Sequence, residues 1–270
     1  MVGCCYQLFL TMSSSVEEEY RRTQEERRDH VKNLKLEYEF GCFEERRPES
    51  CQFLGEYRES IEQKFKEAYE LFRNNCETFK YPKSCWKEAQ YLLAGGHGIK
   101  TDVNKAIQKL DLACNDAKEP MKQSCRLLAR VYYYGDENRP AESEKAEHFM
   151  KRACELEDWE GCWCLSVMYM SQDQKFLGKR HKIKDPQKEK KAKYRGSLPV
   201  DMQKALHYGI LACDNNVVES CFNVQRMYYL GDGIPRDLDK AKEYMDKGVQ
   251  LLKIAKSQES VQPFVGISNQ

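Results

Sequence analysis

Residues 145–170 have the sequence KAEHFMKRACELEDWEGCWCLSVMYM, in which two helix-forming runs meet at a short connection. Cys154 ends the first run, and Cys162 begins the second. A cysteine at the end of one helix can be joined to a cysteine at the start of the next across an antiparallel helix pair. This stretch therefore predicts a helical hairpin closed by a disulfide.

The same arrangement occurs five times along the chain, with the two cysteines always eight to eleven positions apart. The predicted disulfide pairs are Cys42/Cys51, Cys76/Cys85, Cys114/Cys125, Cys154/Cys162 and Cys213/Cys221. An alanine lies eight positions before the first cysteine of four pairs, at Ala68, Ala106, Ala146 and Ala205, and Ala241 continues the register without a cysteine pair. A period of about 34 to 40 residues is typical of helix–turn–helix repeats that stack on one another.

Positions after the second cysteine follow the same repeat. The tenth position holds Gly95, Gly135 and Gly231, which we expect to end helices as C-caps. The next helices begin near Asp102, Ser143, Asp201 and Asp237, whose side chains can cap them. Small residues that allow two helices to approach closely occur at Gly55, Ala89, Ala129 and Ser166. The sequence predicts an all-α fold, an αα-solenoid forming a right-handed superhelix of about five repeats.

The organisation of the chain follows from this register. We expect a disordered extension at 1–15, a charged capping helix at 16–41, a repeat solenoid at 42–255 and a C-terminal tail at 256–270. Residues 172–200 interrupt the period with ten Lys or Arg against three acidic residues. We interpret them as a solvated, disordered insertion, with a docking site for anionic lipid or an acidic protein as the alternative.

Composition limits the possible classes of function and the possible cellular compartments. The 270 residues carry a net charge of +1, which gives no indication of nucleic-acid binding, and the apolar runs are too short for a membrane span. Ten of the thirteen cysteines fall in pairs, which indicates an oxidising compartment. The N-terminal MVGCCYQLFLTM resembles neither a secretory signal nor an Arg-rich transit peptide. The mitochondrial intermembrane space, with its thiol-oxidising import relay, satisfies both observations.

Few residues outside the pairs suggest chemistry, and we expect no catalytic residue and no metal ligand. Ser84 and Lys87 form the one Ser-x-x-Lys motif, but a serine also precedes Cys51, Cys125 and Cys221, so Ser84 is interpreted as a repeat residue. The remaining cysteines are candidates for free thiols, at Cys4, Cys5 and Cys164. For Cys164 a buried thiol is the main expectation, and a reactive thiol or a haem or metal ligand is the alternative.

The histidines and aromatic residues could serve packing or solvation alone, or they could bind haem or a partner protein. His148 and His207 share one repeat position that elsewhere holds Gln or Glu, which is typical of a solvated face. Haem ligation by His207 or His97 with a sulfur is the alternative, and otherwise no cofactor is expected. We expect the rings of Trp86, Trp159 and Trp163 to cover disulfides, and Tyr132–Tyr134 and Tyr228–Tyr229 to line a concave surface that holds partners.

Three stretches carry a resemblance to a known family. They are CFEERRPESCQFLGEY at residues 42–57, SCFNVQRMYYLGDGI at 220–234 and SVQPF at 260–264. With the repeating cysteine frame, they resemble Sel1-like repeats of the cysteine-rich, Hcp-like subclass, and within it the cytochrome c oxidase assembly factors of the mitochondrial intermembrane space. The basic insertion, the longer N-terminus and Cys164 depart from that pattern.

The resemblance implies a non-enzymatic scaffold for the assembly of respiratory complex IV, with complex IV subunits or other assembly factors as partners. It also implies import and oxidation through the disulfide relay of the intermembrane space. Two alternatives stay open at this point. One is a haem-binding thiol–disulfide oxidoreductase that supports copper delivery to complex IV, which would require a labile cysteine pair or a reactive Cys164. The other is a secreted cysteine-rich Sel1 binding protein.

Overall fold

The structure, a computed structural model, describes residues 3–136, 138–170 and 195–261, and the side chains within 22–136, 138–170 and 195–257. Every regular element within these ranges is a helix. The helices are α1 (Gly3–Phe43), α2 (Pro48–Ser60), α3 (Phe65–Phe79), α4 (Pro82–Ala94), α5 (Val103–Cys114), α6 (Lys122–Tyr133), α7 (Ser143–Glu155), α8 (Trp159–Tyr169), α10 (Met202–Asp214), α11 (Val218–Leu230) and α12 (Leu238–Val261). The predicted all-α repeat fold is confirmed.

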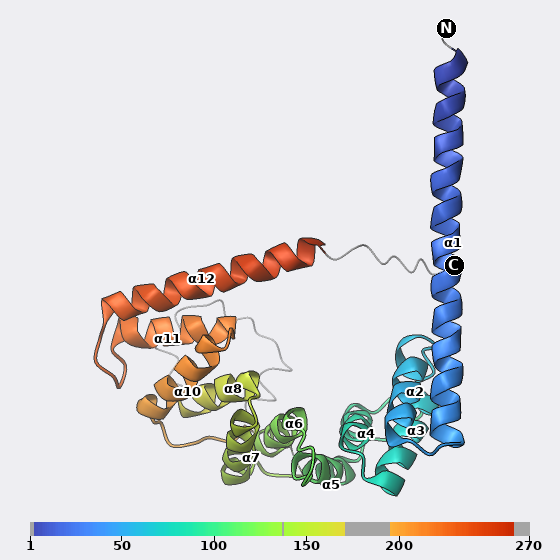
Figure 1. The fold of residues 1–270 in the computed structure, drawn as a ribbon. Helices are drawn as coiled ribbons and strands as arrows, with labels where there is room; N and C mark the ends of the chain where they lie inside the picture. The colour runs from blue at the N-terminus through green and yellow to red at the C-terminus, as the bar shows by residue number, and fades with distance from the viewer. Residues whose placement is uncertain (1–2, 137, 171–194, 262–270) are drawn as a thin grey trace. The chain divides into compact units, whose positions relative to one another are not determined.

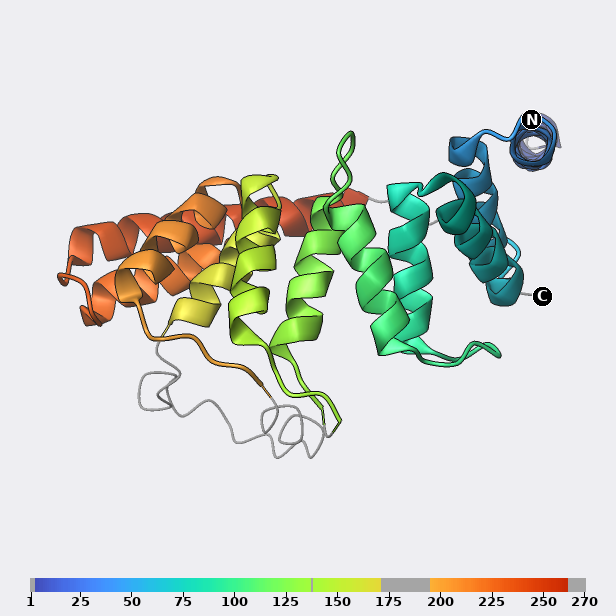
Figure 2. The ribbon, with the colours of Figure 1, turned by 90° about the horizontal axis from the view of Figure 1, so that it is seen from below.

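The chain divides into two compact units, residues 1–109 and 110–270, and the boundary falls within α5. In the first unit, α1 packs on α2, α2 on α3 and α3 on α4. In the second, the packing order is α6, α7, α8, α10, α11 and α12 (Figure 1). Neighbours in sequence are therefore neighbours in space within each unit, as Figure 2 shows from a second direction. This is the packing expected of a helical repeat.

Five disulfides join the cysteine pairs that the spacing predicts. The Sγ–Sγ distances lie between 2.01 Å for Cys154–Cys162 and 2.13 Å for Cys42–Cys51. Each bridge connects the last turn of one helix with the first turn of the next, and three pairs are fully buried: Cys76–Cys85, Cys114–Cys125 and Cys213–Cys221. Each bridge closes a short loop, which in the chain-entropy model stabilises the fold by about 2–3 kcal/mol.

Successive hairpins of the second unit are connected by a repeated aromatic stack. The tyrosine seven positions after the second cysteine stacks on an aromatic ring of the following helix: Tyr132 on Phe149, Tyr169 on Tyr208 and Tyr228 on Tyr244, with interplanar angles of 9°, 10° and 15°. A lysine ammonium lies 5.1–5.2 Å from each tyrosine centroid, from Lys145, Lys204 and Lys240. Stacking and cation–π attraction each contribute about 0.5–1.5 kcal/mol, so these contacts fix the spacing of the hairpins.

Buried small residues allow the helices to approach closely. Ala68, Ala106, Ala146 and Ala205 have no exposed surface, and neither do Ala89, Ala129 and Ser166. A Cβ atom on Gly55 would lie 2.4 Å from the ring of Phe72, so this position of α2 requires glycine. The predicted close approach at these positions is confirmed.

The structure corrects one of the predicted helix ends. Gly95 and Gly231 follow α4 and α11 with φ of 67° and 70°, as a C-capping glycine should. The prediction for Gly135 was wrong, because Tyr134 ends α6 in an extended conformation. Gly135 is needed for another reason: a Cβ there would lie 2.6 Å from the Arg139 carbonyl oxygen and the Ala141 nitrogen.

The predicted caps of the next helices hold with one exception. Asp102, Asp201 and Asp237 each accept a hydrogen bond from the backbone N–H three residues later, at 2.9–3.0 Å. Ser143 does not cap α7, since it is already the first residue of that helix. Its Oγ accepts instead from the backbone N–H of Ser197 at 3.1 Å.

The ends of the predicted segments also differ from the structure. Helix α1 begins at Gly3, so helical backbone covers the predicted disordered extension from that residue on; no proline or further glycine interrupts it before Gly41. Helix α12 runs to Val261, six residues past the predicted end of the solenoid. Most of the basic insertion lies outside the described residues. At its C-terminal end, the Gly196 N–H donates to the Tyr133 carbonyl oxygen at 2.7 Å and the Leu198 side chain is buried. These last residues of the predicted solvated insertion therefore pack against the repeat.

Candidate functional site

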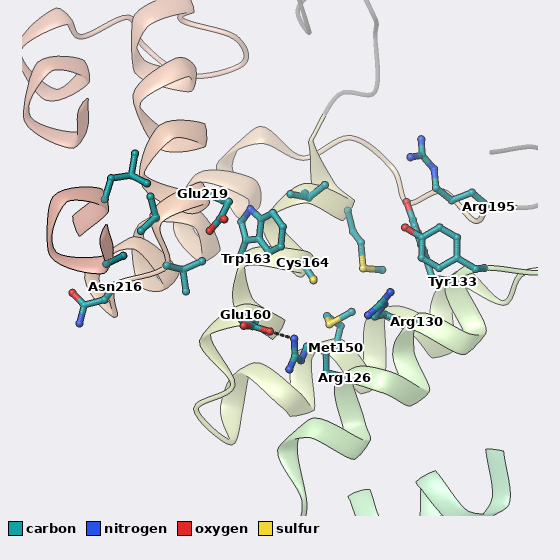
Figure 3. Close-up of a pocket in the computed structure, with 17 residues that line it drawn as sticks. Arg126, Arg130, Tyr133, Met150, Glu160, Trp163, Cys164, Arg195, Asn216 and Glu219 are labelled. Atoms are coloured by element: carbon teal, nitrogen blue, oxygen red, sulfur yellow. Dashed lines mark hydrogen bonds and ion pairs between the residues drawn. The ribbon is translucent and has the colours of Figure 1, made fainter. Parts of the chain in front are cut away.

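The candidate site is a groove of 760 Å³ in the second unit, between the faces of several repeat helices (Figure 3). Helix α6 contributes Arg126, Arg130 and Tyr133. These residues are four and three positions apart, so they lie on one face of the helix. The fully buried Leu128 lies on the opposite face and the fully buried Cys125 at its flank, and their burial fixes the orientation of α6.

Helix α8 forms the central wall of the groove. Glu160, Trp163, Cys164 and Val167 occupy positions i, i+3, i+4 and i+7 of the helix and therefore share one helical face. Met168 of α8 and Met150 of α7 add flexible thioether side chains beside them. Most of this wall is apolar, and its one acidic side chain is Glu160 at the first turn.

An ion-pair cluster fixes one arginine of the groove. The Arg126 Nε atom lies 2.9 Å from Oδ2 of Asp158, and its Nη1 pairs with Glu160. The other oxygen of Asp158 accepts from the Gly161 N–H at 3.1 Å and so caps α8. Asp158 is only 6% exposed, so the cap and the ion pair hold α6 and α8 in register.

Arg130 differs from Arg126 in its electrostatic surroundings. It lies one helical turn further along α6, and its side chain is exposed. Within the described ranges, no carboxylate lies within ion-pair distance of its guanidinium. Arg130 therefore offers the groove a cation that the described part of the protein does not neutralise.

The remaining wall comes from segments distant in sequence. Asn216, Val217, Val218 and Glu219 lie at the start of α11, and Leu252 and Ala255 belong to α12. Tyr133, Tyr134 and Arg195 line the opposite part. In Figure 3, Glu219 lies on one side of Trp163 and Cys164, while Arg130, Tyr133 and Arg195 lie on the other. The groove thus has an acidic side chain on one side, basic side chains on the other and apolar residues between them.

The thiol of Cys164 is free and lines the middle of the groove. Burial raises the pKa of this thiol, although Arg126 and Arg130 act in the opposite direction. A raised pKa lowers the thiolate fraction near neutral pH and with it the nucleophilicity of the sulfur. The thiol is half-buried rather than fully buried as expected, and its raised pKa gives no support to a reactive thiol.

The structure separates the tyrosines that the sequence grouped together. Tyr133 and Tyr134 line the groove, whereas Tyr132 stacks on Phe149 between hairpins. Tyr228 likewise stacks on Tyr244, and neither Tyr228 nor its exposed neighbour Tyr229 lines the groove. Arg126 and Arg130 were not predicted from the sequence, although their spacing in SCRLLARVYYYG is the signal that places both on one helix face.

Ser84 belongs to a buried hydrogen-bond network in the first unit. Its hydroxyl donates to Oε1 of Gln52 at 2.6 Å and accepts from Nδ2 of Asn75 at 2.6 Å. Lys87, the lysine of the same motif, forms an ion pair with Glu59 at 2.5 Å. Ser84 and Lys87 are thus both held by contacts between the helices, which supports the interpretation of Ser84 as a structural residue of the repeat.

The other candidate residues occupy different places. His148 and His207 are exposed, and exposed His97 stacks on Phe65 at 4.1 Å. Trp159 and Trp163 pack against the cluster of Cys154, Cys162 and Ala212, as expected; no described contact places Trp86 on a disulfide. The side chains of Cys4 and Cys5 lie outside the described residues.

The described part of the chain contains no group of three or more His, Cys, Asp or Glu side chains arranged to hold a metal ion. Among the same residues, no helix is both long and apolar enough to span a membrane.

Comparison with known proteins identifies the repeat. The Sel1 repeat family matches residues 82–115, 122–158, 192–217 and 218–251. Cytochrome c oxidase assembly factor 7A of Xenopus laevis is 28% identical over 86% of this chain and 92% of its own length. Cytochrome c oxidase assembly factor 7 of Homo sapiens is 28% identical, covering 89% and 94%, and its Drosophila melanogaster homologue is 27% identical, covering 90% and 96%.

Solved structures show the same fold. A Sel1 repeat protein from Oxalobacter formigenes superposes with a TM-score of 0.57 at 17% identity, covering 76% of this chain and 73% of that one. A protective antigen of uropathogenic Escherichia coli with an SLR fold gives a TM-score of 0.53 at 15% identity, covering 78% and 42%. At these identities the likeness concerns the fold alone.

Proposed function

Because this chain is a Sel1-repeat protein similar along most of its length to cytochrome c oxidase assembly factors, we propose that it takes part in the assembly of respiratory complex IV in mitochondria. The observation that carries the proposal is this similarity, which covers more than nine-tenths of the Xenopus and human relatives. It also covers 86% and 89% of this chain, so it is not confined to one or two repeats.

We propose further that the protein acts by binding other proteins, as a scaffold without catalytic activity or cofactor. The described polar residues support this mechanism, because the Ser-x-x-Lys serine is buried in a packing network and the groove thiol has a raised pKa. The clients would be subunits of complex IV or other assembly factors. Stacked helical repeats generally present extended surfaces for such partners.

The proposed compartment is the intermembrane space, reached through its disulfide relay. Support comes from the five bridges, which join ten of the thirteen cysteines. A bridge in every hairpin makes folding depend on oxidation, which the reducing cytosol does not favour. Loss of the relay should therefore lower the amount of folded protein.

The test is deletion of the gene in cells of its own organism, followed by measurement of assembled complex IV on native gels. Loss of assembled complex IV with other respiratory complexes unchanged, restored by the wild-type chain, is the expected result. Normal complex IV in deleted cells would overturn the proposal. Protease protection in mitochondria with ruptured outer membranes tests the compartment: the protein should become digestible only after rupture.

A further inference from the structure

We propose that the groove of the second unit is the docking site for a short peptide segment of a partner protein, one that combines apolar side chains with an acidic residue. The inference rests on the proposed binding function and names the surface and the chemistry of the partner. The docking face is formed by residues of α6, α7 and α8 together with residues at the start of α11 and in α12.

The apolar middle of the groove sets the first requirement. Val167 and Met168 of α8, Val217 and Val218 at the start of α11, and Leu252 of α12, which is 39% exposed, all line the groove. Apolar surface gathered in a concavity is stabilised when another apolar surface covers it. A volume of 760 Å³ is within the range of pockets that hold ligands of peptide or drug size.

Arg130 sets the second requirement. Arg126, on the same face of α6, is held by Asp158 and Glu160, so its charge is already neutralised. Arg130 has no such partner in the described ranges and lies beside Tyr133 at the edge of the groove (Figure 3). A carboxylate of the partner would form a charge-assisted hydrogen bond with its guanidinium.

Trp163 adds a rigid aromatic side chain to the lining of the groove. Its indole nitrogen is shielded from solvent and has no acceptor among the described atoms. A buried donor without an acceptor is unfavourable. A water molecule does not reach this nitrogen, so a carbonyl oxygen of a bound peptide would pair with it only after the indole ring shifts. Trp163 also offers a large rigid surface, as do the anchor residues of many interfaces.

The charge distribution favours a peptide over an anionic lipid. Glu160 and Glu219 also line the groove, and Glu219 lies on the side of Trp163 away from Arg130. A lipid with a purely anionic head group gains nothing at these carboxylates. A peptide can place its acidic side chain at Arg130 and its backbone N–H groups or a basic side chain at Glu219, which matches both signs.

The experiment selects random heptapeptides displayed on phage against the full oxidised chain, then measures the enriched peptides by fluorescence anisotropy. We expect enriched peptides to combine Leu, Met or Phe with Asp or Glu. Arg130→Glu should weaken their binding at least tenfold, which corresponds to about 1.4 kcal/mol. Lys242→Glu, an exposed cation of α12 that does not line the groove, is the matched control and should leave binding unchanged.

Replacing the acidic residue of the peptide by its amide supplies a second readout. The wild-type chain should lose affinity for the amide peptide, whereas Arg130→Glu should not discriminate against it, because the interacting charge is already gone. Equal binding by Arg130→Glu and the wild type, enriched peptides without an acid, or no enrichment would overturn the inference. Vesicles of phosphatidylcholine and phosphatidylglycerol that bind only when Arg130 is present would overturn it in favour of a lipid.

The failure of this inference is distinguishable from failure of the proposed function. In deleted cells, the Arg130→Glu chain should accumulate to the wild-type level and restore complex IV less well. If wild type and Arg130→Glu restore complex IV equally, the groove is not the docking site while the assembly role stands. If deletion leaves complex IV intact, the proposed function fails, and the peptide measurements still decide what the groove binds.

Discussion

The backbone N–H of Asp201 donates to the carbonyl oxygen of Tyr169 at 3.0 Å, although the whole basic insertion lies between them in sequence. The same bond joins Glu142 to Tyr132 at 2.9 Å and Asp237 to Tyr228 at 3.0 Å across much shorter connections. Tyr169 also stacks on Tyr208 as the other two tyrosines stack on their partners. The insertion therefore adds length without changing how α8 and α10 pack.

Replacing residues 172–193 by a Gly/Ser linker of about ten residues should leave the stability of the chain unchanged within about 1 kcal/mol, because loop closure depends weakly on length. Thermal melting followed by circular dichroism measures this. Tyr169→Leu is the control that removes the stack and the cation–π contact, and it should cost about 1–2 kcal/mol. A linker variant that melts as low as Tyr169→Leu would show that the insertion stabilises the repeat.

The disulfides should be reduced in an order set by burial. Cys42 and Cys51 are 7% and 6% exposed and Cys154 is 6% exposed, whereas both sulfur-bearing residues of the other three pairs are fully buried. A thiolate reductant must reach a sulfur, so Cys42–Cys51 should open first and the three buried bridges only on unfolding. Mass-resolved alkylation at rising dithiothreitol concentration follows each pair. Simultaneous loss of all five would contradict the expectation.

Cys114→Ser should lower the free energy of unfolding by about 2–3 kcal/mol, since it removes a fully buried bridge that closes a short loop. Cys164→Ser is the matched control, because it changes the same atom in a thiol that forms no bridge, and we expect a cost below about 1 kcal/mol. Urea unfolding of the oxidised proteins measures both. Equal costs for the two variants would argue against the stabilising role of the bridge.

Glu88 is a carboxylate without exposed surface whose charge is balanced by two lysines of α5. Lys109 Nζ lies 3.0 Å from one oxygen, and Lys105 Nζ lies 3.2 Å from the other. Neither contact has hydrogen-bond geometry, so the pairing is mainly electrostatic. The Lys109 side chain is 12% exposed and the Lys105 side chain 34% exposed. Because water screens Lys109 less, we expect it to offset more of the buried charge of Glu88.

Lys109→Met should therefore destabilise the chain by about 3 kcal/mol, because it leaves Glu88 buried with one hydrated partner. Lys105→Met, the matched substitution at the more exposed lysine, should cost about 1 kcal/mol or less. Adding Glu88→Leu to Lys109→Met should recover part of the loss, since the unpaired charge disappears. Chemical unfolding of the three variants checks this order, and equal effects of the two lysine substitutions would contradict it.

Packing of α1 on α2 should weaken in acid. Hydrogen bonding to Lys35 of α1, with further contributions from Arg58 and Lys64 that outweigh burial, lowers the pKa of Glu62 from 4.5 to about 2. A carboxyl whose folded pKa is depressed stabilises the folded state above its unfolded pKa, and this stabilisation is lost as pH falls from about 4.5 towards 2. Because these groups are partly hydrated, we expect an effect on the order of 1 kcal/mol.

Glu62→Gln isolates this contribution. The wild type should melt higher than the variant at neutral pH, and the difference should shrink as pH falls below about 4.5 and vanish once pH falls through about 2. Melting curves of both proteins across this range measure it. A difference that stays constant with pH would mean that Glu62 acts through packing rather than through its charge.

The sequence by itself determined the repeat. The five cysteine pairs, the alanines eight positions before them and the capping aspartates are local patterns, and each specifies helix ends or helix contacts within some forty residues. Such signals depend on residue spacing along one hairpin and its neighbour, so no long-range information was needed. For the same reason the disulfide partners and the all-α fold could be predicted from residue spacing alone.

The tertiary structure decided where a partner could bind. Arg130 becomes a groove residue only because residues of α8, the start of α11 and α12, which are distant from it in sequence, line the same groove. Tyr132 and Tyr133 are adjacent in sequence, yet one stacks between hairpins and the other lines the groove. Gly135 and Ser143 failed as caps for a similar reason: their roles come from segments that pack on them, Arg139 to Ala141 and Ser197. A helix pattern shows which residues share a face, but only packing of distant segments determines which face is covered and which stays open.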